Sequence, residues 1–159
     1  MKTTLETTPT LREGERLDRE EFMDRWEALP NLKHAELIGG KVPLRLFPLS
    51  LEHGGGESVA SMWLGVYAAA TPGCICNGKT TWYMRDDAPE PEGHLRILPE
   101  YGGQSSTILR NGRHFGVGAP KLVVEVSLST RTYDLSVKKN YTAREACWSF
   151  PAFSPKKRR

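Results

Sequence analysis

The chain has 159 residues, of which 38% are hydrophobic, 26% charged and 9% aromatic, and its net charge is +3. This composition is typical of one globular domain and excludes collagen-like, coiled-coil and wholly disordered chains. No stretch approaches the roughly 20 apolar residues that a membrane-spanning helix needs. The N-terminus is polar and contains acids, which excludes a secretory signal, so we expect a cytoplasmic protein.

The three cysteines, Cys74, Cys76 and Cys147, agree with a reducing compartment. Their number is odd and their spacing shows no disulfide framework. Cys74 and Cys76 supply two zinc ligands at most, whereas a structural zinc site needs four. A zinc site is therefore disfavoured.

Charge is unevenly distributed along the chain. Residues 131–159 contain eight Lys or Arg against two acids, whereas the other 130 residues contain 14 against 17. A basic end can bind a polyanion. For the run PKKRR at 155–159 taken alone, a solvated tail is the simpler explanation.

Caps, turns and apolar spacing predict the first elements. Residues 1–15 are polar without an apolar period, and we expect them to be disordered. A helix is expected from the capping residue Asp18 to Pro30, with Glu21 placed as in a capping box. Its apolar stripe consists of Phe22, Trp26 and Leu29. Two short apolar runs, 34–38 and 41–46, then flank Gly39-Gly40 and predict a β-hairpin.

The remaining elements complete an α/β pattern. Residues 99–118 are rich in glycine and predict an excursion on the surface. We expect a second helix at 57–70, strands at 80–84, 95–98 and 122–126, and a final helix at about 134–144. Strands interleaved with helices predict a sandwich, in which helices flank a central mixed β-sheet. We place a single domain at 16–148 and a basic tail at 149–159.

Glu125 is unusual because it lies among Leu122, Val123, Val124 and Val126. In a central strand its carboxylate would be buried, at a cost of several kcal/mol if it were left unpaired. Such a carboxylate is normally compensated by a metal ion or a basic side chain. In an edge strand, Glu125 would instead face water, and the pattern alone leaves both arrangements open.

Two other groups are candidates for a site with Glu125. Lys138 follows Asp134 by one helical turn, so the two share a helix face, although an ordinary surface ion pair is the simpler explanation. Glu92 lies in the acidic loop DDAPEPEG at 86–93. Hard oxygen ligands of this kind suit Mg²⁺ or Mn²⁺. The alternative is a solubilising loop, unless the fold brings Glu92 next to Glu125.

Several segments also carry a family resemblance. They are NLKHAELIGGKV, PEPEGHLRILPEYGG and GAPKLVVEVSLSTRTYDLSVKK, in this order, with a loop bearing His53 after the first. In this pattern the chain resembles the bacterial "putative restriction endonuclease" (Uma-two) family of the PD-(D/E)XK nuclease superfamily. The similarity runs from Leu32 to Tyr141, about two-thirds of the chain.

This resemblance implies a restriction-endonuclease-like fold and a Mg²⁺-dependent endonuclease that cleaves DNA, with Mn²⁺ as a substitute. It implies that Glu92, Glu125 and the backbone carbonyl of Val126 hold the metal, which would neutralise a phosphodiester and lower the pKa of a bound water. It also implies that Lys138 stabilises the attacking hydroxide and the charge on phosphorus. Glu36 would orient the water or a second metal.

The chain departs from the family pattern at two places. Glu92 stands where the family has an aspartate, and one extra methylene can displace a metal by about an ångström, enough to cost around a hundredfold in rate. The expected helix end and closing strands are missing after Tyr141, so we expect an exposed sheet edge. An alternative function is therefore an impaired nuclease-fold remnant that binds nucleic acid or another protein. A homodimer formed through the sheet edge is a third hypothesis.

His53 lies where relatives often carry a histidine, before the second helix. It is a candidate contact for phosphate or substrate. A structural or surface role is favoured for this side chain.

Overall fold

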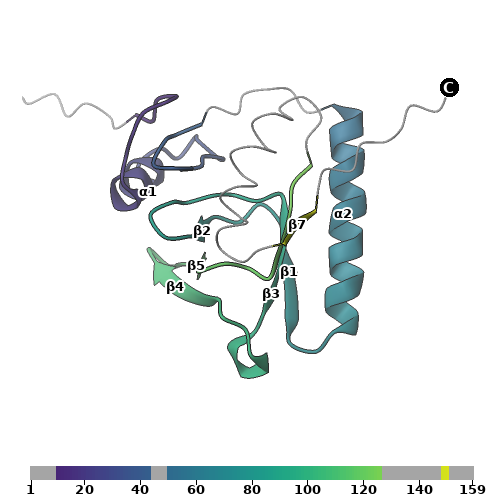
Figure 1. The fold of residues 1–159 in the computed structure, drawn as a ribbon. Helices are drawn as coiled ribbons and strands as arrows, with labels where there is room; N and C mark the ends of the chain where they lie inside the picture. The colour runs from purple at the N-terminus through teal and green to yellow at the C-terminus, as the bar shows by residue number, and fades with distance from the viewer. Residues whose placement is uncertain (1–9, 44–49, 127–147, 151–159) are drawn as a thin grey trace, which may run out of the picture.

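The computed structural model describes residues 10–43, 50–126 and 148–150. The α/β class expected from the sequence is confirmed (Figure 1). In chain order, the elements are helices α1 (Arg19–Glu27) and α2 (Leu51–Ala70), strands β1 (Cys74–Asn77), β2 (Trp82–Tyr83) and β3 (Gly93–Ile97), the 3₁₀ helix η1 (Pro99–Tyr101), and strands β4 (Ser106–Arg110), β5 (Arg113–Val117), β6 (Leu122–Val124) and β7 (Trp148–Phe150).

A four-stranded mixed sheet in the order β1-β3-β6-β7 forms the part of the molecule next to α2. Strand β3 runs antiparallel to both β1 and β6, and β7 runs parallel to β6. Helix α2 packs against β1 and β3 (Figure 1). Gly93 permits this approach, because a Cβ atom there would lie 2.7 Å from Cδ1 of the buried Leu64 on α2.

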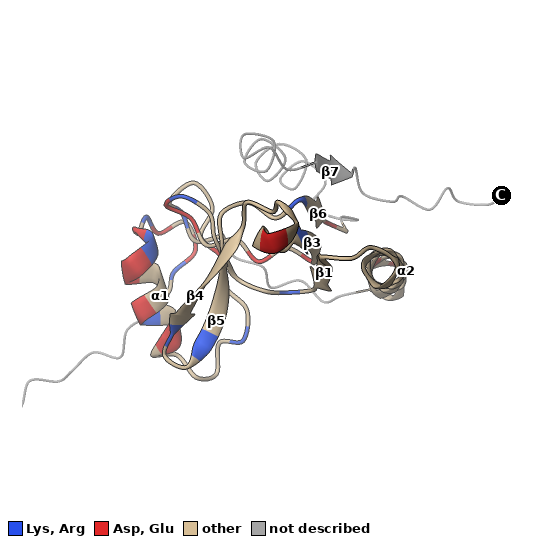
Figure 2. Ribbon diagram, turned by 90° about the horizontal axis from the view of Figure 1, so that it is seen from below, with Lys and Arg blue, Asp and Glu red and all other residues tan. Residues whose placement is uncertain are grey.

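A three-stranded sheet in the order β2-β5-β4 lies next to α1, on the other side of the molecule from α2 (Figure 2). Between this sheet and α1 lies a hydrophobic core. Its buried members are Leu17, Phe22, Met23, Leu37, Val42, Tyr83 and Ala88. Because these side chains come from α1, the Gly-Gly turn region and β2, the core joins the N-terminal third of the chain to the second sheet.

The predicted first helix is confirmed. Asp18 precedes α1, and its side chain accepts a hydrogen bond of 2.8 Å from the backbone N–H of Glu21, one of the donors that a helix N-terminus leaves unpaired. Phe22 is fully buried, and the indole N–H of Trp26 donates to the backbone oxygen of Leu32. The helix ends at Glu27, before Pro30.

The Gly39-Gly40 turn is confirmed too, although its strands are short. Ile38 and Lys41 each donate a backbone hydrogen bond to the other, at 2.9 and 3.2 Å. Both glycines have positive φ, as a two-residue hairpin turn of this kind requires. Of the second predicted run, 41–46, the structure describes residues 41–43.

The expected surface excursion at 99–118 is largely exposed, but it is more regular than its glycine content suggests. This segment contains η1 and a regular β-hairpin, β4–β5, whose turn is Asn111-Gly112 with positive φ at both residues. Asn-Gly is the strongest short hairpin signal, but the number of glycines obscured it. Gly116 is required by packing, since a Cβ atom there would lie 2.5 Å from the Trp82 ring.

Strand β6 is central in the sheet, which decides between the two arrangements left open for Glu125. It lies between β3 and β7, and Val123 is 1% exposed. The edge-strand alternative is therefore wrong. The expectation that the strands after Tyr141 are missing is also wrong, since β7 (Trp148–Phe150) pairs with β6 and covers its outer side. The predicted helix at 134–144 lies outside the described residues.

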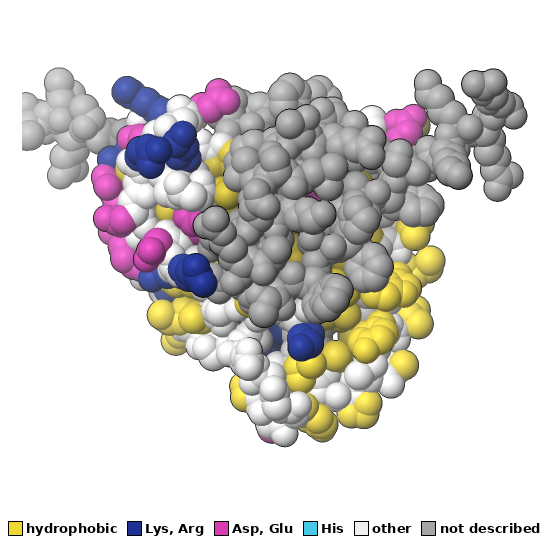
Figure 3. All heavy atoms as spheres, viewed as in Figure 1, with side chains coloured by type: hydrophobic (Ala, Val, Ile, Leu, Met, Phe, Trp, Pro, Cys, Tyr) yellow, Lys and Arg dark blue, Asp and Glu magenta, His cyan; other side chains and the backbone are white. Residues whose placement is uncertain are grey.

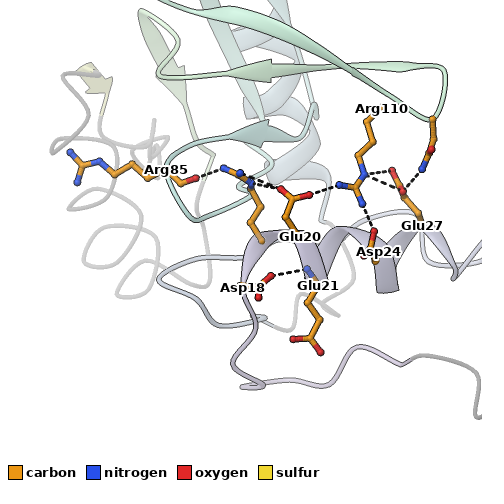
Figure 4. Close-up of polar contacts among 9 residues, drawn as sticks. Asp18, Glu20, Glu21, Asp24, Glu27, Arg85 and Arg110 are labelled. Carbon is orange, nitrogen blue, oxygen red and sulfur yellow. Dashed lines mark hydrogen bonds and ion pairs between the residues drawn. The ribbon is translucent and has the colours of Figure 1, made fainter.

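Arg110 connects the β4–β5 hairpin to α1 (Figure 4). Its guanidinium lies 2.7 Å from Glu20, 2.5 Å from Asp24 and 3.2 Å from Glu27, and the side chain is only 17% exposed. The three carboxylates lie on one face of α1 at i, i+4 and i+7. One cation thus holds three acids of the helix against the hairpin.

Helix α2 presents a contiguous apolar surface on its outer side (Figure 3). The exposed large apolar side chains on this helix are Leu51, Val59, Met62, Trp63, Val66 and Tyr67. Within the described part of the chain, no helix is long and apolar enough to cross a membrane.

Candidate metal centre

Lys79, Glu92 and Glu125 have their backbones near one end of the four-stranded sheet. The last residue pair between β3 and β6 is Gly93 with Val124, so Glu92 and Glu125 are the next residues beyond it on the two neighbouring strands. Glu92 is 9% exposed, and Glu125 is partly buried. On the other side of Glu92, the backbone N–H of Lys79 donates to the oxygens of Pro91 and Glu92 at 3.1 and 3.3 Å. The backbone therefore holds Lys79, Glu92 and Glu125 at the same edge.

Helix α2 adds a histidine and a further carboxylate to this edge. His53 and Glu57 lie one turn apart on the helix, so they face the same way. His53 Nε2 is 3.5 Å from Glu92 Oε1. One ligand atom each from His53, Glu57 and Glu92 lies within 4.8 Å of the other two. Imidazole and carboxylate groups at this spacing can share a metal ion.

The ammonium of Lys79 lies between the two carboxylates of this cluster. Its Nζ is 2.9 Å from Glu57 Oε1 and 4.0 Å from Glu92 Oε2. The hydrogen bond with Glu57 raises the pKa of Lys79 above its ordinary value, and the charge of Glu92 adds to this against the opposing effect of burial. The cluster therefore already attracts and holds a cation.

The environment of the His53 side chain suits a metal ligand. Its Nε2 is buried and has no hydrogen-bond partner within the described residues. A buried nitrogen of this kind normally has one. The side chain is 14% exposed, so little water reaches it. A cation in the cluster would provide the missing partner.

Glu36 is buried at 4% exposure and belongs to the segment beside the acidic loop. Leu37 and Ala88 exchange backbone hydrogen bonds of 3.1 Å, which hold the two segments together. Glu36 Oε1 accepts a hydrogen bond of 2.8 Å from the backbone N–H of Glu90. Glu36 thus positions the loop two residues before Glu92.

The acids of the loop have separate roles. Asp87 is buried, and its two oxygens accept hydrogen bonds from the backbone N–H groups of Gly39 and Gly40 at 2.7 and 2.9 Å. It therefore stabilises the hairpin turn. Glu90 Oε2 lies 3.2 Å from His34, whereas Asp86 is exposed. Glu92 is the acid of this loop that enters the metal cluster.

The structure places the predicted site residues as follows. Glu92 and Glu125 adjoin the paired ends of two neighbouring strands, β3 and β6, and Val126 is buried next to α2, where a Cβ atom on Gly56 would lie 3.0 Å from its Cγ1. Lys138 lies outside the described residues. The sequence analysis missed Glu57 and Lys79, and it favoured a structural role for His53. The spacing of His53 and Glu57 was a usable signal, but the predicted helix began only at residue 57.

His94 and Trp82 form a buried pair outside this cluster. The indole N–H of Trp82 points to His94 Nε2 at 3.2 Å, and the rings meet edge to face. Burial, assisted by the charge of Arg96, lowers the pKa of His94 to about 4. The imidazole is therefore neutral at pH 7 and accepts the indole hydrogen bond, as a structural histidine.

Comparisons with known proteins bear on the fold. No family model matches the sequence, and no curated protein matches it. A solved structure does match: a putative nuclease belonging to DUF820 from Anabaena variabilis, with a TM-score of 0.57 and 18% identity over 80% of this chain and 72% of that chain.

The chain shares the fold of that protein. At 18% identity most side chains differ, so the similarity is one of backbone fold.

Proposed function

We propose that the protein is a metal-dependent endonuclease that hydrolyses phosphodiester bonds of DNA. The observation that carries the proposal is the position of Glu92 and Glu125 next to the paired ends of β3 and β6, with Glu92 3.5 Å from His53 of α2. The fold shared with a protein described as a putative nuclease supports it. A buried carboxylate beside a histidine and a second carboxylate, as at Glu92, favours a metal site over a solubilising loop.

The residues fit a divalent metal ion. Glu92 and Glu125 supply carboxylate oxygens, and the carbonyl of Val126 follows directly on the same strand end. A bound Mg²⁺, or Mn²⁺ in its place, supplies a Lewis acid for the phosphate and a more acidic water. The protein's part is to hold these oxygens in place, and they follow directly after β6, which is paired on both sides.

We assign supporting roles to two further residues. Glu36 fixes the loop before Glu92 through the backbone of Glu90, and thereby orients the metal-binding carboxylate. Lys138, in the segment after β6, would stabilise the negative charge that develops on the phosphate oxygens. The basic residues at 131–159 would attract the DNA backbone. We further propose a cytoplasmic location, and a homodimer stays a hypothesis.

The test is cleavage of a supercoiled plasmid with Mg²⁺ or Mn²⁺ by the wild type and by Glu125→Ala. We expect the variant to lose at least a hundredfold in rate, because one of two metal carboxylates is gone. The matched control is Asp86→Asn, an exposed acid of the nearby loop, which we expect to cleave like the wild type. Equal cleavage by Glu125→Ala and the wild type would contradict the proposal.

A second candidate function is a non-catalytic nucleic-acid-binding protein. The observation that favours it is Glu92, whose carboxylate lies on a longer side chain than the aspartate of the resembling family. This candidate predicts salt-sensitive DNA binding without metal-dependent cleavage by a folded sample. Binding measured at 50 and 200 mM salt, beside the cleavage assay, separates the two functions.

A further inference from the structure

We propose that the ammonium of Lys79 occupies the His53–Glu57–Glu92 cluster when no metal is bound, as an internal counter-ion. When metal is available, a first-row transition ion replaces the ammonium there, in preference to Mg²⁺. The inference rests on the proposed function in that it concerns the metal of the same edge. Helix α2 then contributes ligands to the metal site, and Lys79 competes with the ion for them.

The first step is the position of the ammonium. Lys79 Nζ is 2.9 Å from Glu57 and 4.0 Å from Glu92, the same two carboxylates that belong to the metal cluster. A divalent ion bound to these oxygens would stand within a few ångströms of the ammonium. Two like charges so close repel each other strongly in a partly buried site. Metal and ammonium therefore compete for one position.

The second step is that the ammonium is able to leave. The Lys79 side chain is 38% exposed, whereas His53 and Glu92 are 14% and 10% exposed. The backbone of Lys79 stays anchored through its hydrogen bonds to Pro91 and Glu92. A long side chain on a fixed backbone can turn its charged end to water at little cost. Replacement by metal thus requires a side-chain movement and no change of fold.

The third step is the nitrogen ligand. Mg²⁺ prefers oxygen ligands, whereas imidazole is a common ligand of transition metals. His53 Nε2 is buried, lies 3.5 Å from Glu92 Oε1 and lacks a hydrogen-bond partner within the described residues. Ligand atoms about 2.1 Å from a shared ion lie at most about 4.2 Å apart. The ligand atoms of His53, Glu57 and Glu92 lie within 4.8 Å of one another, which is close to that distance. Small rotamer changes would therefore bring all three to a shared ion.

Charge balance supports the exchange. The cluster brings two carboxylates, those of Glu57 and Glu92, to a single ammonium, which compensates only half of their negative charge. A divalent ion in its place brings the group to neutrality, which a partly buried cluster favours. The arrangement therefore has a preferred direction when metal is available.

The experiment is titration calorimetry of Mn²⁺ and Mg²⁺ into metal-free, full-length protein and four variants. Lys79→Met removes the competing charge with a similar shape, Lys79→Arg keeps the charge, and His53→Gln removes the imidazole. Lys121→Met is the matched control, an exposed lysine at the other end of β6. Circular dichroism and thermal melting of each sample establish that it is folded.

We expect Mn²⁺ to bind the wild type at least tenfold more tightly than Mg²⁺. Lys79→Met should bind Mn²⁺ at least tenfold more tightly than the wild type, while Lys79→Arg and Lys121→Met should not. In pulsed electron paramagnetic resonance, bound Mn²⁺ should show a ¹⁴N coupling that His53→Gln abolishes. If folded Lys79→Met gains no affinity for Mn²⁺, the role of Lys79 as a counter-ion is wrong. If the ¹⁴N coupling is unaffected by His53→Gln, the role of His53 as a metal ligand is wrong.

These results are separable from those of the cleavage assay. If Lys79→Met gains Mn²⁺ affinity but the wild type cleaves no DNA, the exchange stands and the nuclease function fails. If Glu125→Ala abolishes cleavage but Lys79→Met gains no affinity, the nuclease stands and the counter-ion fails. Neither result depends on the other.

Discussion

At the scale of single residues, histidines in this protein have opposite environments. His53 lies among carboxylates at the sheet edge, whereas His94 is 1% exposed and bonded to the indole of Trp82. A buried imidazole is costly to protonate because burial removes water from the charged form. His94 therefore influences the pH dependence of stability, whereas His53 is a candidate metal ligand.

The pKa of His94 predicts a loss of stability in acid. In the unfolded chain the imidazole takes up a proton near pH 6.5, whereas in the folded chain it does so at about 4. The stabilisation is complete above pH 6.5 and is lost progressively as the pH falls toward 4. The difference corresponds to about 3 kcal/mol.

The measurement is urea unfolding of the wild type and His94→Gln at pH 7.5 and pH 4.5. Glutamine keeps an acceptor for the Trp82 N–H but does not titrate. We expect the free energy of unfolding of the wild type to fall by about 2 kcal/mol more than that of the variant over this interval. Equal losses in both proteins would contradict a depressed pKa for His94.

The residues of the candidate site were predictable to different degrees. Glu125 stood out because an acid interrupted an apolar run, and the family resemblance paired it with Glu92. Glu57 and Lys79 carried no such signal, since their ion pair joins a helix to a turn 22 positions later in the chain. Contacts of this kind arise from tertiary packing and leave no local pattern.

At the scale of elements, the sequence predicted the helices and strands that carry a clear local signal, such as a capping residue, a proline or an apolar run. Helix α1 has a capping aspartate and a following proline, and β6 is an uninterrupted apolar run. Helix α2 begins six residues earlier than expected, because three consecutive glycines at 54–56 are poor helix formers that only tertiary packing tolerates. Strand β1, CICN, was missed since it lacks an alternating polar pattern.

Replacing Arg110 should weaken the attachment of the β4–β5 hairpin to α1. Arg110→Met leaves Glu20, Asp24 and Glu27 without their shared cation (Figure 4). Exposed ion pairs are each worth well under 1 kcal/mol, but a partly buried network is worth more. We expect a loss of about 1–2 kcal/mol in the free energy of unfolding.

Urea unfolding at 50 mM and 500 mM NaCl tests this role of Arg110. The loss should be smaller at high salt, because mobile ions screen the network. Arg113→Met is the control, since Arg113 is exposed on the same hairpin, and we expect a change below about 0.5 kcal/mol. A loss shared by both variants would contradict a specific role for Arg110.

Glycine at position 93 sets the distance between α2 and the sheet. A Cβ atom there would lie 2.7 Å from Leu64 Cδ1, inside any permitted contact. Gly93→Ala must therefore displace Leu64, at a cost of about 1–3 kcal/mol. Because His53 and Glu57 lie on the same helix, we also expect weaker Mn²⁺ binding.

The control for Gly93→Ala is Gly102→Ala, at a position where a Cβ atom meets nothing within 4 Å. That substitution has its own backbone strain, since Gly102 has a φ of +82°, but it does not touch α2. Both variants should lose stability in urea. An unchanged Mn²⁺ affinity in folded Gly93→Ala would contradict the coupling between helix packing and the metal centre.

At the scale of the whole molecule, the metal centre joins parts of the chain that local forces leave separate. The ligands that we propose come from α2 and from the residues that adjoin the ends of β3 and β6, and Glu36 attaches the N-terminal segment to the loop that carries Glu92. An ion bound to all of them resists any opening that separates the helix from the sheet. Metal binding should therefore stabilise the fold as a unit.

The stabilisation follows from mass action. A ligand that binds the folded chain alone, at one hundred times its dissociation constant, adds about 2.7 kcal/mol to the free energy of unfolding. We expect this increase for the wild type with Mn²⁺, measured by urea unfolding against a sample in EDTA. Glu57→Gln, which removes the second ligand of α2, should show less than half of it at the same Mn²⁺ concentration. An equal increase in both proteins would mean that the helix takes no part in holding the ion and that the metal is bound by the strands alone.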